Sequence, residues 1–141
     1  MENLQINTGV KRIMINDDPG KFIEFNPEDV LFAERFYALI KVFEEQEAKF
    51  QARLKQISEN EAKDGYGIPL NTQETFDLVI EICNFIREQL DKVFGAGTSA
   101  TVFGETQSLG MFEQFFAGIA PFIQNSRVSK VTKYQMKKSG K

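Results

Sequence analysis

The sequence predicts a mainly α fold (α+β minor): an N-terminal β-hairpin, a long helix, a central apolar helix, a shorter C-terminal helix and a basic flexible tail. Apolar residues recur every three or four positions in three long stretches, the spacing that places side chains on one face of an α-helix. The N-terminal residues are instead rich in β-branched side chains and contain turn formers. We expect a single helical domain at 1–125, with its hairpin at 1–25, and a disordered tail at 126–141.

The N-terminal hairpin is predicted from two short stretches of strand-forming residues. Residues 4–15 form one extended segment or two short strands, and residues 21–25 form the next strand. Asp17, Asp18, Pro19 and Gly20 between them supply turn chemistry. Because two strands alone are only marginally stable, we expect the hairpin to pack on the helices or to pair with strands of another copy.

The long helix is predicted at residues 27–58, with Asn26 as N-cap and Pro27 at the first helical position. Glu47 interrupts its apolar seam, so the first half should pack on the domain and the part from Glu44 onward should form a charged, partly projecting arm. This arm either folds back on the central helix or forms an intermolecular coiled coil. The stripe consists of Phe36, Ile40, Phe43, Phe50, Leu54 and Ile57.

The central helix is predicted to begin at Asn71, Thr72 and Glu74, which resemble a capping box, and to end at Phe94 before Gly95. It is apolar almost all around, which is typical of a core helix, and the long helix should lie antiparallel along it. The flanking stretches 59–70 and 94–105 are rich in glycine or polar residues and are expected to be connecting loops. The second lacks the Gly-Lys-Ser/Thr end of a phosphate loop.

The C-terminal helix is predicted to open at Glu105 or Thr106 and to be kinked or ended by Pro121. Its phenylalanine-rich face has two interpretations. It completes the core against the central helix, or it forms an adaptable apolar surface for partner helices. The candidate partner-binding residues, two of them from the long helix, are Phe112, Phe115, Phe116, Ile119, Phe122, Ile123, Phe50 and Leu54.

The composition argues against catalysis. The chain contains 14 Phe but no His, so it has no Ser/His or Cys/His nucleophile pair and no imidazole metal ligand. We therefore predict no enzyme, no catalytic or metal-binding residue and no cofactor. Cys83, the single cysteine, lies on an apolar stripe and is expected to be a reduced core thiol. Two groups of carboxylates are expected to form solvated helix faces: Glu44, Glu45 and Glu47, and Asp77, Glu81 and Glu88.

Charge is distributed unevenly along the chain. Residues 1–125 carry 11 bases and all 20 acids, a net charge of −9, whereas residues 126–141 carry six bases and no acid. These six form an electrostatic tail that could attract nucleic acid in a salt-dependent way, although the acidic body opposes this. There is no signal peptide and no membrane-spanning run, so we expect a cytoplasmic, non-secreted protein. The tail bases are Arg127, Lys130, Lys133, Lys137, Lys138 and Lys141.

Three features together resemble the tail assembly chaperones of long-tailed bacteriophages and prophages of Gram-positive bacteria. They are the N-terminal hairpin running into FNPEDVLFAERFYALIKVFEE (25–45), the segment NTQETFDLVIEICNFIREQLDKVFGAGTS (71–99), and the basic end. The resemblance implies a non-catalytic helical protein that coats the tape measure protein, keeps it soluble and helps to recruit tail-tube subunits.

Two other functions remain open at this stage. The first is a structural phage or cytoplasmic component that forms homo-oligomers through the hairpin edges and the projecting arm. The second is a nucleic-acid-associated protein that uses the lysine-rich tail.

Overall fold

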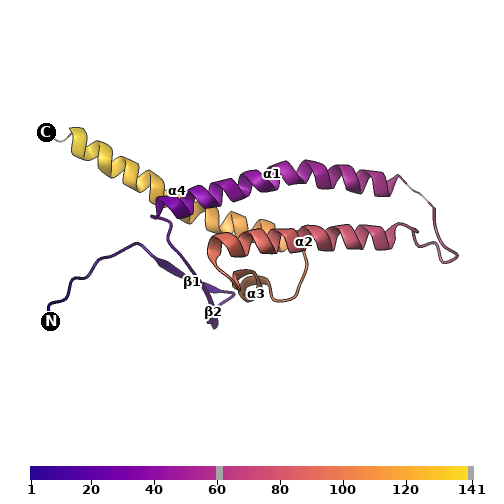
Figure 1. The fold of residues 1–141 in the computed structure, drawn as a ribbon, viewed down its shortest axis with the longest axis horizontal. Helices are drawn as coiled ribbons and strands as arrows, with labels where there is room; N and C mark the ends of the chain where they lie inside the picture. Colours follow the sequence, from indigo (N-terminus) through magenta and orange to yellow (C-terminus); the bar gives the residue numbers. More distant parts are fainter. Residues whose placement is uncertain (60–61, 140–141) are drawn as a thin grey trace.

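The computed structural model confirms the mainly α fold with an N-terminal hairpin (Figure 1). It describes residues 1–59 and 62–139, and the side chains of these up to residue 125. Within this part of the chain, no helix is long and apolar enough to cross a membrane. The elements are β1 (Lys11–Ile15), β2 (Asp18–Phe25), α1 (Val30–Ser58), α2 (Thr72–Phe94), α3 (Thr98–Phe103) and α4 (Leu109–Ser139).

The hairpin is present, but its turn lies earlier than the sequence analysis placed it. The reversal occurs at Asn16 and Asp17, whose φ angles are +52° and +58°, and Pro19 falls inside β2. Two consecutive left-handed residues match the right-handed twist of the flanking strands, and Asn and Asp tolerate this conformation better than most residues. The strands are antiparallel, with Ile13 opposite Ile23.

Helix α1 begins at Val30, three residues later than predicted. Its N-cap is Asp29, whose side chain accepts a hydrogen bond from the Leu31 amide. Asn26 was the predicted cap, but its side chain accepts from the Glu28 amide and donates to the carbonyl of Thr8. The residue is therefore used in the turn between the hairpin and the helix.

Helices α1 and α2 lie side by side and antiparallel, as predicted, and form a two-helix arm that extends beyond the rest of the molecule (Figure 1). Arg53 of α1 and Glu81 of α2 form a bidentate ion pair across the arm, with nitrogen–oxygen distances of 2.8 and 3.0 Å. At the far end, the Asn71 side chain donates to the carbonyl of Ile57, at 2.7 Å. These contacts hold the helix ends together across the intervening loop.

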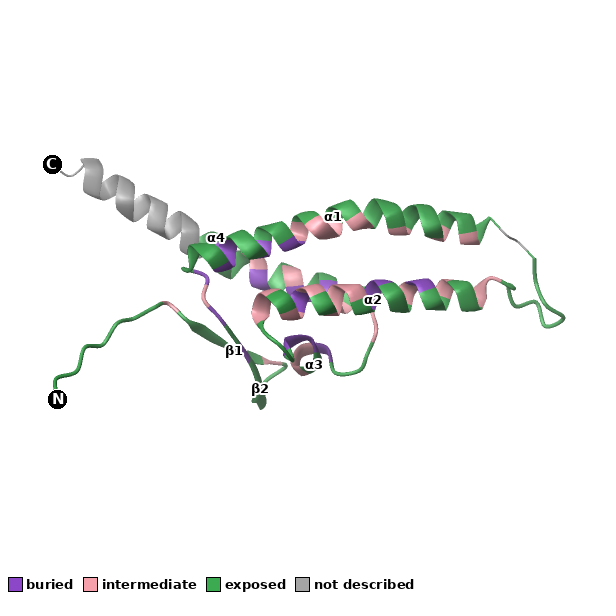
Figure 2. Ribbon diagram, viewed as in Figure 1, coloured by how far each residue is buried: buried purple, intermediate pink, exposed green. Residues whose placement is uncertain are grey.

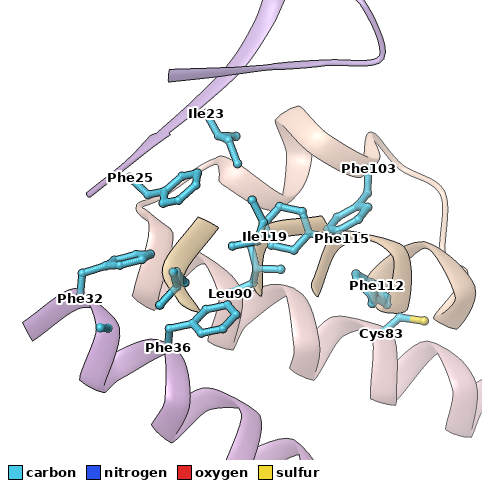
Figure 3. Close-up of a cluster of buried hydrophobic side chains, with 12 residues drawn as sticks. Ile23, Phe25, Phe32, Phe36, Cys83, Leu90, Phe103, Phe112, Phe115 and Ile119 are labelled. Carbon is cyan, nitrogen blue, oxygen red and sulfur yellow. The ribbon is translucent and has the colours of Figure 1, made fainter. Parts of the chain in front are cut away.

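The core lies at the base of this arm, where β2 and the four helices supply its buried residues (Figure 3), and Ile13 and Ile15 of β1 pack against it. Phe94 at the end of α2 is its aromatic centre: its ring packs against four others at centroid distances of 5.3–6.1 Å, each edge to face. The buried cluster consists of Ile23, Phe25, Phe32, Ala33, Phe36, Cys83, Leu90, Phe103, Phe112, Phe115, Ile119 and Ile123.

The stretch 94–105 is not a simple flexible connection, because it contains the short helix α3. Asp91 of α2 accepts hydrogen bonds from both the amide and the hydroxyl of Ser99, at 2.7 and 3.0 Å. The Thr98 hydroxyl donates to the carbonyl of Gly95. Both hydroxyl residues are buried, and these bonds satisfy their polar groups, which allows the helix to close over the core.

Helix α4 begins at Leu109 rather than at Glu105 or Thr106, and it continues past Pro121 to Ser139. Pro121 lacks an amide donor, so one helical hydrogen bond is missing, yet the helix does not end there. Residues 122–139 contain no glycine or proline, which permits the continuation. The backbone of 126–139 is thus helical where we expected disorder. The side chains of the predicted electrostatic tail lie outside the described residues.

Candidate interaction surfaces on the helical arm and the hairpin

The predicted partner-binding residues of α4 are mostly core residues. Four of them have exposed fractions between 0% and 7%: Phe112, Phe115, Ile119 and Ile123. This burial agrees with the first of the two interpretations, in which the helix completes the core. Phe122 remains 39% exposed. The burial follows from the helical repeat: positions three and four apart share one face, and this face meets the end of α2. Most of the phenylalanine-rich face therefore stabilises the fold.

A first groove lies where the arm leaves the core, and we call it the arm groove. It has a volume of about 260 Å³, just below the range of ~300–1,000 Å³ typical of small-molecule pockets. Phe50 and Leu54 of α1 line it together with Phe112 and Phe116 of α4, so the structure brings four of the eight predicted residues together. The remaining apolar lining is Phe43, Ile82, Phe85, Ile86 and Leu109.

The aromatic walls of the arm groove contact one another. Phe85 of α2 lies 6.2 Å from Phe50 and 6.3 Å from Phe43, measured between ring centroids, and Phe43 lies 5.1 Å from Phe116. Glu47 and Glu113 lie at the rim. Glu47, which interrupts the heptad in the sequence, thus makes one edge of an apolar groove acidic. The surface is suited to a few apolar side chains of a partner that also carries positive charge.

A second groove, the hairpin groove, lies between β1 and the helices α3 and α4, with a volume of about 340 Å³. Phe115, Ile119 and Phe122 of the predicted set line it. Its other lining residues are Ile13, Met14, Ile15, Asn16, Val102, Phe103, Met111, Gln114 and Gly118. Ile123 contributes to neither groove and is fully buried.

The charged face of the arm is open to solvent. In the ion pair between Arg53 and Glu81 both side chains are about half exposed. The hydrogen bonds between the two side chains stabilise both charged forms, so they lower the pKa of Glu81 and raise the pKa of Arg53. Among the described residues, no group of three or more His, Cys, Asp or Glu side chains is placed to hold a metal ion.

Cys83 is fully buried between α2 and α4, as expected of a core thiol. Burial raises the pKa of its thiol, and the nearby positive charge of Arg87 opposes this only in part. A raised pKa leaves less thiolate, the reactive form, so the side chain is suited to packing rather than to nucleophilic chemistry.

Arg87 is an important residue that the sequence analysis missed. Its guanidinium donates to the Gln107 side chain at 2.7 Å and to the carbonyl of Thr106, and it lies over the rings of Phe103 and Phe112, 5.7 and 6.0 Å from their centroids. It therefore fastens the segment between α3 and α4 to α2. One signal was available in the sequence: the arginine at 87 lies one helical turn from the apolar residues Cys83 and Leu90.

Comparison with known proteins identifies the family of the chain. Residues 19–141 match DUF6673, which is described as a family of unknown function. The chain belongs to this family. The DUF6673 match covers all four helices and begins within β2, so that β1 and the residues before it precede the matched region. No curated protein and no solved structure gives a significant match.

Proposed function

We propose that this DUF6673 protein is a non-catalytic tail assembly chaperone of a long-tailed phage or prophage, which binds the tape measure protein and aids tail-tube assembly. The single observation that carries the proposal is the arm groove, an apolar surface on a pair of antiparallel helices with aromatic walls and an acidic rim. Together with the resemblance in the sequence, this surface favours binding of a helical protein client over catalysis.

The groove indicates the character of the client segment. A helix that presents apolar residues at positions i, i+3 or i+4, and i+7 would place them against Phe50, Leu54 and Phe85. Lysine or arginine beside these residues would face Glu47 and Glu113. Such a segment exposes an apolar stripe when it is unassembled, so covering the stripe would keep the client soluble.

Co-expression with a helical fragment of the tape measure protein tests this proposal. We expect the fragment to stay soluble and to co-elute with the protein. Leu54→Asp should weaken binding at least about tenfold, since burying a leucine is worth roughly 1.5–3 kcal/mol. Ala52→Asp adds the same charge on the opposite, exposed face of α1 and should leave binding unchanged. No co-elution, or equal loss in the two variants, would refute the arm groove as the client site.

A second function, that of a permanent structural component that forms homo-oligomers, is favoured by one observation. The hairpin and the residues before it expose apolar side chains, among them Leu4, Met14 and Phe22. Mass spectrometry of purified particles separates the two functions. A chaperone should be absent from mature particles, whereas a structural component should be present in stoichiometric amounts.

A further inference from the structure

The ten residues before β1 form an extended arm, the N-terminal arm, that lies apart from the rest of the molecule (Figure 2). Leu4, Ile6 and Val10 are 82%, 73% and 56% exposed. In an extended chain alternate residues share one face, so Leu4 and Ile6 lie on the same face. Residues 4–10 carry no charge. An apolar, alternating, uncharged and unpaired segment is typical of a strand that pairs with another chain.

The direction of this arm is fixed by a corner at Gly9. Gly9 has a φ of +89°, and its amide donates to the Asn7 side chain at 3.0 Å. Asn26 donates to the carbonyl of Thr8 at 2.6 Å, and a Cβ on Gly9 would collide with the carboxylate of Glu28. These contacts hold the chain against the start of α1 and direct the arm away from its own hairpin.

A receiving site for such a strand lies at β1. In the described part of the chain the sheet has two strands, so β1 has one unpaired edge, while β2 packs on α3 and α2. The hairpin groove is lined by four consecutive residues, Ile13 to Asn16. These four are the last three residues of β1 and the first residue of the turn, so the groove borders the turn end of β1, opposite α3 and α4. Its floor is apolar, with Phe115 and Ile119.

We propose that the N-terminal arm of one copy adds as a strand to the free edge of β1 in a second copy, and that it inserts Leu4 and Ile6 into the hairpin groove. The arm does not reach its own groove, because Val10 leads directly into β1 and the residues before the corner at Gly9 run away from the hairpin (Figure 2). Every copy carries both the donor strand and the receiving edge. Self-association therefore requires no other component, and this inference is independent of the proposed client site.

Sedimentation of the full-length protein over a range of concentrations tests this inference. We expect the unaltered protein to self-associate, and Leu4→Asp with Ile6→Asp to weaken association at least about a hundredfold, roughly tenfold for each aliphatic side chain. Asn3→Asp with Gln5→Asp is the matched control, because it adds the same charge on the other face of the strand. Circular dichroism should be unchanged in both variants. A monomer at all concentrations, or equal weakening in the two double variants, would overturn the proposal.

Cross-linking separates exchange between copies from pairing within one copy. In a Cys83→Ala background, isotopically heavy Ile6→Cys protein is mixed with light Met14→Cys protein and oxidised. Disulfide-linked dimers of heavy with light chains are expected. The absence of such mixed dimers would contradict exchange. So would efficient formation of a disulfide within one chain, in a monomeric protein that carries both Ile6→Cys and Met14→Cys. No client is present in either experiment, so failure here leaves the proposed function standing.

Discussion

Replacing Arg87 by methionine should loosen the segment between α3 and α4. The substitution keeps the length of the side chain but removes two short hydrogen bonds, to Gln107 and to the carbonyl of Thr106. The bond to the carbonyl of Ser99 is long, at 3.4 Å, and contributes little. The loss of the cation over the rings of Phe103 and Phe112 is partly offset by contacts of the methionine sulfur with the same rings.

The expected loss of stability follows from the two short bonds of Arg87. A hydrogen bond to a charged group contributes about 1.5–3 kcal/mol, and because Arg87 is only half buried we take the lower end for each, about 3 kcal/mol in total. For a chain of 141 residues the entropy of unfolding is about 0.3 kcal/mol/K, so Tm should fall by about 10 °C.

Urea denaturation followed by circular dichroism measures this loss of stability, and hydrogen exchange shows where it acts. The amides of α3 should lose protection before those of α2, because Arg87 joins the neighbouring segment to α2. Arg87→Lys keeps the charge but lacks the planar guanidinium group, so its loss of stability should be about half that of Arg87→Met. Arg35→Met, at an exposed site of α1, should change stability by less than about 0.5 kcal/mol. A loss below about 1 kcal/mol with α3 still protected would refute this role.

Two further predictions concern the two-helix arm and the thiol of Cys83. The hydrogen bonds from Arg53 lower the pKa of Glu81, so the stability that they contribute should be present at neutral pH and be lost as the pH falls below the ordinary carboxylate range. Glu81→Gln should remove this contribution to the pH dependence. Urea midpoints of both proteins from pH 7 to pH 2 would measure the difference. Because the pair is exposed, its effect should also shrink in high salt, and an unchanged pH profile in Glu81→Gln would exclude the pair as the cause. Burial raises the pKa of Cys83, so a thiol reagent at pH 8 should label it only in urea; rapid labelling of the folded protein would contradict the packing of α2 on α4.

The sequence predicted the helices best where local signals and packing agree. For α2 the predicted end at Phe94 is the observed one, because an apolar helix followed by Gly95 has no local alternative. The predicted start of α1 at Pro27 is wrong, since Asn26 bonds to Thr8, 18 residues away, and the cap function passes to Asp29. The bond that occupies Asn26 joins it to a residue distant in the sequence, so the helix segment itself does not indicate that the cap shifts to Asp29.

Other features depended on contacts that are distant in the sequence. Helix α3 was missed because its stretch is rich in glycine and hydroxyl residues, and the bonds that Ser99 donates to Asp91 of α2 are not visible in the stretch itself. Apolar pattern alone also overstated burial: Val30, Phe76 and Ile80 are 59%, 57% and 46% exposed. The arm groove is formed by three helices, so no single stretch of sequence indicates its shape; the spacing of Phe50 and Leu54 indicated only that they share one face of α1, and both line the groove.

Helix α4 determines how the two proposed surfaces can be studied. Its buried face, at Phe112, Phe115 and Ile119, joins the elements of the core, while Phe116 borders the arm groove and Phe122 borders the hairpin groove. The rings of Phe115 and Phe116 lie 5.6 Å apart, so a truncation of either would disturb the packing beneath both grooves. The loss of binding in an α4 core variant would therefore not distinguish a client site from an unfolded protein. Substitutions outside α4, at Leu54 on the wall of the arm groove for the client and at Leu4 and Ile6 of the N-terminal arm for self-association, leave α4 intact and can separate the two functions.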